Sequence, residues 1–238
     1  MKEIKKDIWV AETKFKLFGA DFGNRMTVIR VGTGELLLHS PIKISDAILN
    51  SVRKLGKVSF IVTPNNFHGL FVEEWRKKFP EAKYFTAKEV KENDNLTFSL
   101  GSLRSEYFGR KIEIIKIDGA PKVNEYAFIH KESKTLILTD IAFNIGANVS
   151  LWSKVFFKLN GAFDKFGPSR LMKTMISDPV ALSNSIEKIL SFDINRIIVS
   201  HGNILESNAR GALKEAFCGF SSSKPSKPTA RFSLCRCG

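Results

Sequence analysis

The sequence predicts an α+β fold: a four-layer αββα sandwich, in which two β-sheets pack face to face beneath outer helices, or an α+β relative of it. The order of the expected elements leads to this prediction. A strand-rich start is followed by a strand–helix–strand–helix stretch, a second strand-rich run, and a final helix–strand–helix series. Two sheets with amphipathic helices on their outer faces would bury the apolar side of each element.

The first part of the chain predicts a meander of short strands and then a helix. Short apolar runs predict strands at Ile8–Ala11, Met26–Arg30 and Glu35–His39, and Gly32-Thr33-Gly34 is expected to turn the chain between the last two. Ser45 is a favourable N-cap, and Gly56 is a stop signal for the helix that follows. The helix places Ile48, Val52 and Leu55 on one face.

The next stretch alternates strands and helices. Val58–Val62 is an almost wholly apolar strand, as expected when both faces of a sheet are covered. A second helix is expected to run to Phe79, before Pro80, and to bury Leu70, Phe71 and Trp75. A strand at Ala82–Thr86 follows.

The second half is expected to form a second sheet and its helices. Strands are expected at Ile112–Ile117, Tyr126–His130, Thr135–Leu138 and Ile194–Ser200. Helices are expected at Leu151–Phe166, from Asp178-Pro179 to Leu190, and at Glu206–Phe217. Asp178 followed by proline is a strong helix start, because the carboxylate caps the helix and proline fits its first turn.

Composition is that of a globular protein, with 43% hydrophobic and 26% charged residues among 238. We expect residues 1–220 to form one domain and residues 221–238 to be a disordered basic tail rich in Ser, Pro and Lys. The three cysteines, Cys218, Cys235 and Cys237, have no disulfide spacing, which indicates a reducing compartment. Without a signal peptide or a transmembrane segment, the expected location is the cytoplasm.

The chain carries a net charge of +13, so anionic ligands have to be considered. The basic residues are scattered, which also fits a lysine-rich surface that only maintains solubility. The stretch Trp152–Arg170 interleaves lysines with aromatic residues. We favour a core helix with snorkelling lysines there, and a surface that binds anions or membranes, or a lid over a cleft, remains open.

Four polar residues lie at the ends of expected strands or in the turns that follow them, where rigid elements can direct side chains into a shared cleft. They are His39, His68, Asp140 and His201. Imidazole and carboxylate groups are the usual protein ligands of zinc, iron and manganese. A single histidine at a strand end is more often a hydrogen-bonded capping residue. The repeated placement favours His68, Asp140 and His201 as a metal-binding set, whereas His130 is expected at the surface.

Residues 61–69, IVTPNNFHG, resemble the strand and loop that carry the T-H-x-H-x-D-H signature of metallo-β-lactamase-fold hydrolases. Residues 134–140, KTLILTD, resemble their bridging-aspartate strand, and residues 198–202, IVSHG, their last histidine strand. More closely, the chain resembles an uncharacterised domain-of-unknown-function family of this superfamily. The landmarks of that resemblance are Asn24–Arg30, His39-Ser40-Pro41, Pro64-Asn65, Trp75 with Phe79–Ala82, Thr139–Asn144 and Asp178-Pro179. It implies a metallo-β-lactamase-like αββα fold and a metal-dependent hydrolase site.

The resemblance also implies a reduced metal site. The signature histidines would fall at Pro64, Asn66 and Gly69, and its aspartate at His68. One metal site would therefore have lost its histidines, whereas the other would keep His68, Asp140 and His201. Two histidines and one carboxylate can hold a single zinc, iron or manganese ion. Asn65, Asn66 and His39 are candidates for binding substrate or orienting a ligand.

Three functions follow as hypotheses. The protein could be a hydrolase with at most one metal ion, a catalytically inactive relative that binds a ligand or partner without metal, or a binder of phosphate or nucleic acid through its basic surface. The first two imply a small-molecule substrate or ligand, which the charge suggests is anionic, and nucleic acid is the least favoured partner. The sequence does not decide whether the protein is an enzyme, and it leaves the oligomeric state open.

Overall fold

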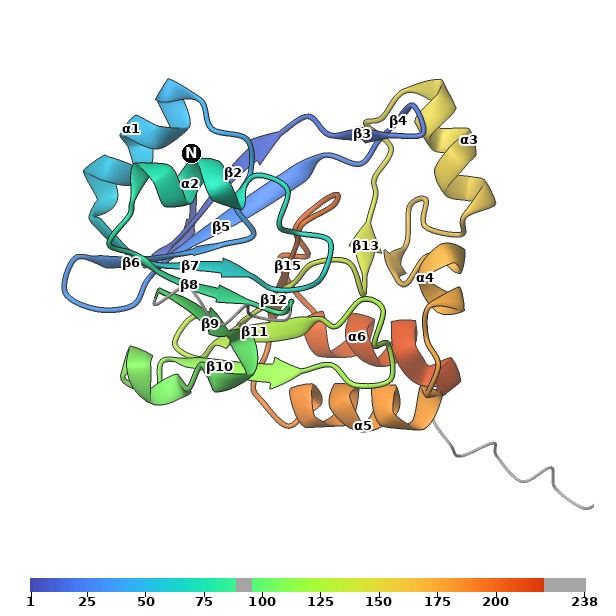
Figure 1. The fold of residues 1–238 in the computed structure, drawn as a ribbon. Coiled ribbons are helices and arrows are strands. Elements are labelled where there is room, and N and C mark those ends of the chain that lie inside the picture. Colours follow the sequence, from blue (N-terminus) through green and yellow to red (C-terminus); the bar gives the residue numbers. More distant parts are fainter. Residues whose placement is uncertain (89–95, 221–238) are drawn as a thin grey trace, which may run out of the picture.

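The computed structural model describes residues 1–88 and 96–220, which form two sheets between two layers of helices. In Figure 1, α1 and α2 lie above the first sheet, and α5 and α6 lie below the second. The predicted αββα architecture is confirmed. The predicted tail, residues 221–238, lies outside the described residues.

The first sheet has seven strands in the order β1-β2-β5-β6-β7-β8-β9. Their bounds are β1 Lys2–Lys5, β2 Ile8–Thr13, β5 Asn24–Arg30, β6 Glu35–His39, β7 Lys57–Thr63, β8 Lys83–Thr86 and β9 Thr97–Ser99. The strands from β1 to β6 pair antiparallel, and those from β6 to β9 pair parallel. The β5–β6 hairpin turns where the glycines predict it, and Gly34 has a φ of 76°.

The second sheet has the order β10-β11-β12-β15. Its strands are β10 Ile112–Lys116, β11 Tyr126–His130, β12 Thr135–Leu138 and β15 Arg196–Val199. The β12–β15 pair is parallel, with Leu138 opposite Val199, so the two strands end at the same edge. Two small pairs, β3 (Lys16–Leu17) with β4 (Ala20–Asp21) and β13 (Phe143–Asn144) with β14 (Phe166–Gly167), lie beyond the main sheets.

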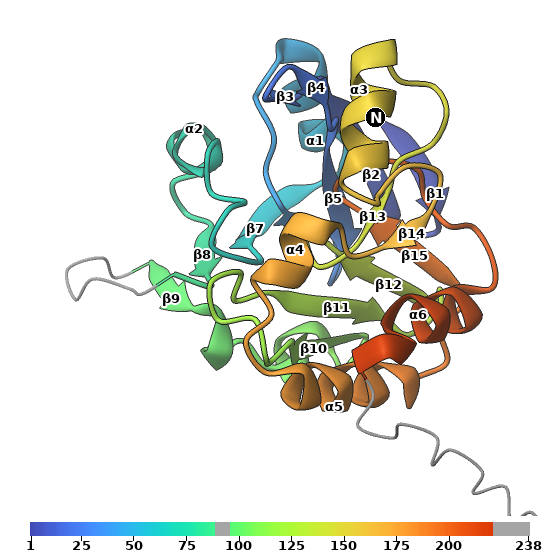
Figure 2. The same ribbon diagram turned by 90° about the vertical axis from the view of Figure 1, so that its right-hand side faces the viewer.

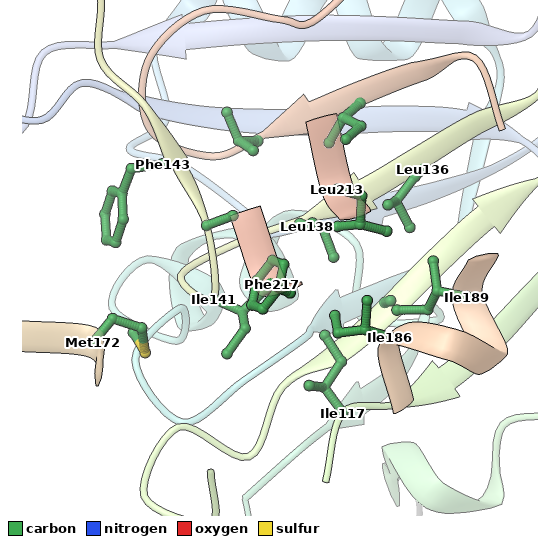
Figure 3. Close-up of a cluster of buried hydrophobic side chains, with 14 of the residues drawn as sticks. Ile117, Leu136, Leu138, Ile141, Phe143, Met172, Ile186, Ile189, Leu213 and Phe217 are labelled. Carbon is green, nitrogen blue, oxygen red and sulfur yellow. The ribbon is translucent and has the colours of Figure 1, made fainter. Parts of the chain in front are cut away.

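The helices cover the outer faces as their apolar spacing predicts. Helix α1 (Asp46–Leu55) begins at the predicted Ser45 cap and buries Leu49 and Val52. With α2 (Val72–Lys78) it packs on the first sheet, where Trp75 is fully buried. Helices α5 (Pro179–Leu190) and α6 (Ala209–Phe217) cover the second sheet, and Figure 3 shows Ile186, Ile189 and Leu213 packed against Leu136 and Leu138.

The space between the sheets is a separate apolar core. Residues of the first sheet, such as Leu37 and Phe60, meet Phe128, Ile137 and Ile198 of the second. Neighbouring residues on each strand point to opposite faces, so each strand contributes both to this core and to the helical layer outside it. This explains the nearly continuous apolar runs in the sequence.

Three predicted helices have different bounds. The helix expected at residues 151–166 is α3, Leu151–Leu159, because the chain turns at Gly161, whose φ is 65°. A separate short helix, α4 (Arg170–Thr174), follows. The second helix starts at Val72, so Leu70 precedes it and is 70% exposed, which corrects the prediction that the helix buries it. Helix α6 starts at Ala209 rather than Glu206, after Asn208 in a left-handed conformation.

Candidate metal centre and apolar cavity

His68, Asp140 and His201 come from three separate connections and meet at one point. The Nε2 atom of His68 lies 3.1 Å from Oδ2 of Asp140, and Nε2 of His201 lies 3.3 Å from Oδ1. The two imidazole rings are 5.2 Å apart between centroids. The two oxygens of one carboxylate therefore each face one histidine.

The fold explains this convergence. Asp140 and His201 each lie two residues beyond the paired ends of β12 and β15, so the parallel register brings them to one edge. His68 lies in the connection between β7 and α2. The end of β7 is joined to the second sheet, because Tyr126 donates its backbone N–H to Pro64 O at 2.9 Å. The candidate site thus lies where the ends of both sheets meet.

His201 is held by contacts on every side. Its Nδ1 lies 2.7 Å from the carbonyl oxygen of Gly23, and Phe143 stacks on its ring at 5.6 Å. Because a carbonyl oxygen can only accept, Nδ1 carries the proton and Nε2 is left to face Asp140. The guanidinium of Arg25 donates to the carbonyl oxygens of Val199 and Gly202, which fixes the backbone on both sides of the histidine.

His68 is oriented by a hydroxyl group and by its own backbone. Its Nδ1 lies 2.5 Å from Oγ of Ser40, and its N–H donates to Oδ1 of Asn65 at 2.9 Å. Burial works to lower the pKa of His68, but the carboxylate of Asp140 outweighs it and raises the pKa above its usual range. Burial works to raise the pKa of Asp140, but the imidazoles of His68 and His201 hold it well below its usual range.

Behind Asp140 lies a second carboxylate, that of Glu125, which is 1% exposed. It accepts hydrogen bonds from the backbone N–H groups of Thr139 at 2.8 Å, Asp140 at 2.8 Å and Ile141 at 3.0 Å. Burial and the charge of Asp140 raise the pKa of Glu125, although these hydrogen bonds oppose the shift. The Glu125 side chain thereby fixes the turn that carries Asp140.

The three other candidates have different surroundings. Asn65 is fully buried and donates to Oδ2 of Asp140 at 2.7 Å. The side-chain amide of Asn66 instead donates to Lys122 O at 3.1 Å. His39 is buried, and the centroid of its ring lies 4.8 Å from that of Phe128. Neither Asn66 nor His39 lines the cavity described below. His130, expected at the surface, is 1% exposed because β11 carries it inside, with its Nδ1 2.8 Å from Ser133 Oγ.

The three converging residues form part of the wall of an apolar cavity of about 300 Å³. The remaining walls come from the β3–β4 hairpin, the β7–α2 connection, α3 and α4, and include Phe15, Phe22, Phe67, Phe156, Phe157 and Met172. Among the described residues that line the cavity there is no lysine or arginine, and Asp140 is the one carboxylate. The cavity therefore suits an apolar ligand with a polar group directed at the two histidines.

The sequence analysis does not predict three residues that orient the candidate ligands: Glu125, Ser40 and Arg25. Arg25 and Ser40 lie in motifs that carry the family resemblance, Asn24–Arg30 and His39-Ser40-Pro41, so those motifs were the available signal. The only indication for Glu125 in the sequence is weak: it is an acidic residue directly before an apolar strand. Its role depends on three N–H groups at residues 139, 140 and 141, beyond the β11–β12 hairpin.

The donor set fits a small cation that prefers nitrogen and oxygen ligands. One ligand atom from each of His68, Asp140 and His201 lies within 4.8 Å of the others. A tetrahedral ion with bonds of about 2.0–2.2 Å separates its ligand atoms by about 3.3–3.6 Å, which small side-chain shifts would reach from the distances above. The bare Nε2 of His201, facing a carboxylate oxygen, needs a cation or a proton between the two atoms.

Comparisons with known proteins agree with this fold. Residues 5–91 match the model of a family described as a domain of unknown function, DUF4336. No curated protein sequence matches the chain significantly. The metallo-β-lactamase DIM-1 superposes with a TM-score of 0.62 at 15% identity, covering 92% of this chain and 97% of that one.

Two further structures extend the comparison. FIM-1 from Pseudomonas aeruginosa, a metallo-β-lactamase solved in a mono-zinc form, gives a TM-score of 0.61 at 10% identity and covers 93% of this chain and 96% of that one. The flavodiiron protein of Giardia intestinalis gives 0.62 at 12% identity, covering 92% of this chain but 58% of that one. The chain has the metallo-β-lactamase fold, and its resemblance to a domain-of-unknown-function family is confirmed over residues 5–91.

Proposed function

We propose that the protein is a hydrolase-like enzyme that binds one metal ion through His68, Asp140 and His201 and acts on a substrate with an apolar group. The observation that carries the proposal is the convergence of these three side chains in the wall of the apolar cavity. Their chemistry fits zinc, iron or manganese. The fold is shared with FIM-1, a metallo-β-lactamase solved in a mono-zinc form, so this fold can hold a single metal ion.

The loop after β7 offers few ligand atoms for a second metal ion. Pro64 has no side-chain donor atom, and the amide nitrogen of Asn66 is bonded to Lys122 O at 3.1 Å. Glycine at residue 69 offers no ligand either. A single-metal site with open positions is therefore the proposed form.

A bound ion would polarise a substrate oxygen and lower the pKa of a water molecule toward about 7. The residues of the chain have supporting tasks. Gly23 O and Ser40 Oγ orient the two imidazoles, while Asn65 and Glu125 hold Asp140. The phenylalanines of the cavity exclude water and bind the apolar part of the substrate.

The cavity narrows the substrate class. A carboxylate or phosphate group inside it would find no lysine or arginine among the described lining residues, so the observations do not support a substrate that buries an anionic group there. A neutral ester, thioester or amide with an apolar acyl or aromatic group matches the lining better. The proposal therefore replaces an anionic small molecule with an apolar one.

A second candidate is a non-catalytic protein that binds an apolar ligand without metal. The observation that favours it is that a protonated His68 and the carboxylate of Asp140 already form a self-contained ion pair, at 3.1 Å. The raised pKa of His68 is consistent with such a pair. The same cavity would then serve as a binding pocket.

Elemental analysis of the untagged full chain separates the two candidates. We expect close to one equivalent of zinc, iron or manganese in the wild type and in His130→Gln, a histidine control outside the site, and little in His201→Ala or Asp140→Asn. Circular dichroism identifies any variant that does not fold. If one of the two ligand variants does not fold, the other is enough to test the loss of metal. A wild type that stays metal-free after zinc and iron are added overturns the enzyme proposal in favour of the second candidate.

The substrate class is tested on the metal-loaded protein with p-nitrophenyl esters of increasing acyl length. We expect kcat/KM to rise with chain length because each buried methylene contributes about 0.8 kcal/mol of transfer free energy. Activity that falls with chain length would contradict the apolar substrate.

A further inference from the structure

Exposed apolar side chains lie on the elements that form the walls of the cavity, and Phe18, Leu70 and Leu171 among them line it. They lie on the β3–β4 hairpin, on the β7–α2 connection, and on α3 and α4. These elements lie on the side of the molecule that faces the viewer in Figure 2. The most exposed are Phe18 (71%), Leu70 (70%), Leu151 (79%), Trp152 (55%), Leu159 (67%) and Leu171 (51%). A soluble surface rarely exposes so many large apolar groups together, so this face needs an explanation.

The elements that carry these side chains are joined to one another, and we call this set of exposed side chains the mouth surface. The indole Nε1 of Trp152 donates to Phe18 O at 3.1 Å, which joins α3 to the tip of the hairpin. Arg170 donates to Leu159 O at 3.1 Å, which joins α4 to the end of α3. Leu70 lines the same cavity as Phe18, which brings in the β7–α2 connection.

Helix α3 has an apolar face on each side. Phe157 is buried against the body of the protein. Leu151, Val155 and Leu159, at a spacing of four residues, form an outward stripe of side chains that are 79%, 42% and 67% exposed. A helix that only covers a core would carry polar residues along that stripe. The predicted core helix with snorkelling lysines therefore accounts for one side of α3 only.

The mouth surface is also basic. Residues 14–22 and 150–175, which contribute the hairpin, α3 and α4, contain seven lysines and arginines and two aspartates. Lys16, Lys158 and Lys173 are exposed on these elements. Residues 66–71 carry no charged residue other than His68. Exposed leucines and aromatic residues interspersed with lysines are the pattern of proteins that lie in the interface of an anionic membrane.

We propose that the mouth surface docks on an anionic lipid bilayer. The apolar side chains enter the boundary between headgroups and acyl chains, and the lysines bind the anionic headgroups. A second copy of the chain fits less well, because a two-fold contact would bring seven basic residues against seven. Nucleic acid fits less well too, because leucine and valine side chains offer no stacking surface for bases.

Docking in this orientation would place the cavity mouth against the bilayer. An apolar ligand could then pass from the membrane into the cavity without crossing water, which has a free-energy cost for each exposed methylene. The docking surface does not depend on the proposed metal ion, because none of the side chains that form it is one of the three ligand candidates. Failure of the metal proposal would therefore leave it standing.

Sedimentation of the full chain with lipid vesicles tests the proposal. The vesicles contain either phosphatidylcholine alone or phosphatidylcholine mixed with phosphatidylglycerol. We expect binding to the mixed vesicles at least tenfold stronger than to phosphatidylcholine alone, and weakened by salt.

Two sets of variants locate the contact. Leu151→Gln combined with Leu159→Gln should weaken binding to mixed vesicles at least fivefold, whereas Tyr107→Gln combined with Val180→Gln, at exposed sites elsewhere, should not. Lys16→Gln, Lys158→Gln and Lys173→Gln together should weaken it at least tenfold. The control is Lys54→Gln with Lys188→Gln and Lys214→Gln, which has the same net charge but leaves the mouth surface intact.

Two results would overturn the proposal. One is equal loss of binding in the variants and their controls, which would mean that net charge alone, rather than this surface, attracts the lipid. The other is no binding to mixed vesicles by a folded wild type. If sedimentation velocity then shows a dimer that Leu151→Gln with Leu159→Gln dissociates, the face belongs to a second copy of the chain.

Discussion

Asn65 donates a hydrogen bond from its side-chain amide to Oδ2 of Asp140 at 2.7 Å and links the loop after β7 to the turn after β12. The same amide lies 3.0 Å from Thr139 Oγ1, and its oxygen accepts the backbone N–H groups of Phe67 and His68, each at 2.9 Å. One side chain thus connects the two sheets and sets the positions of two candidate metal ligands.

Replacing Asn65 with alanine should loosen the site without removing a proposed ligand. We expect zinc affinity to fall by about 10- to 100-fold, the usual effect of losing a group that orients a ligand. Competition titration against a chromophoric chelator measures the affinity. Asn66→Ala is the matched control, because its amide bonds Lys122 O and the change should leave the affinity within about threefold of wild type. Unchanged affinity in folded Asn65→Ala would contradict the positioning role.

Glu125→Gln should destabilise the protein although the side chain keeps its size. One oxygen that accepts backbone N–H groups becomes an amide that donates, so at least one of Thr139, Asp140 and Ile141 loses its partner. Each buried unsatisfied group costs about 1–3 kcal/mol, and urea denaturation should show a loss of that order. Glu113→Gln breaks a partly exposed pair with Lys131 and should change the free energy of unfolding by less than about 1 kcal/mol. Equal losses in the two variants would show that the Glu125 hydrogen bonds are not special.

Stability should decrease in acid because of His39. Burial lowers its pKa to about 3 from 6.5, and the charge of His68 acts in the same direction. Between these values the unfolded chain binds a proton that the folded chain does not, so this residue removes about 1.4 kcal/mol of stability for each unit that pH falls below about 6.5. Its Nε2 has no hydrogen-bond partner among the described residues, so His39→Leu should fold.

Denaturation at a series of pH values checks the effect. The free energy of unfolding of His39→Leu should depend less steeply on pH than that of the wild type between pH 6 and 4, by about one proton. Above pH 7 the two curves should run parallel. Identical slopes across the whole range would mean that His39 does not contribute to the acid sensitivity.

The sequence predicted the layers and the converging residues for a physical reason. Apolar runs mark where buried strands end, and Asp140 and His201 each lie two residues after such a run. The contacts that orient them could not be predicted, because they depend on register between distant segments. Arg25 reaches Val199 O and Gly202 O across 174 and 177 residues, and no local pattern encodes that pairing.

The mouth surface could not be predicted from the sequence for a similar reason. Periodicity identifies an apolar stripe on a helix but does not tell which side meets the protein. Helix α3 has apolar residues on both sides, and its length depends on a turn at Gly161 that the aromatic pattern masks. Leu70 had the right spacing for a helix, but the helix starts two residues later, at Val72.

Gly202 shows how strictly the backbone beside His201 is determined. Its φ is 95°, in the region that favours glycine, and a Cβ there would lie 2.2 Å from the carbonyl oxygen of Asn144. Gly202→Ala must therefore move one of the two backbone segments, which would displace His201 from Asp140. We expect a loss of more than about 2 kcal/mol in the free energy of unfolding and weaker zinc binding.

Gly109→Ala separates the cost of a positive φ from the cost of the close contact with Asn144. Gly109 has a φ of 55°, and apart from Gly109 itself and its chain neighbours no atom of residues 1–88 or 96–220 lies within 4 Å of the added Cβ, so its replacement has only the conformational cost of about 1 kcal/mol. It lies in the connection before β10, away from the candidate ligands, so zinc binding should stay at the wild-type level. If Gly202→Ala loses no more stability than Gly109→Ala and binds zinc as the wild type does, the close contact with Asn144 does not hold His201 in place.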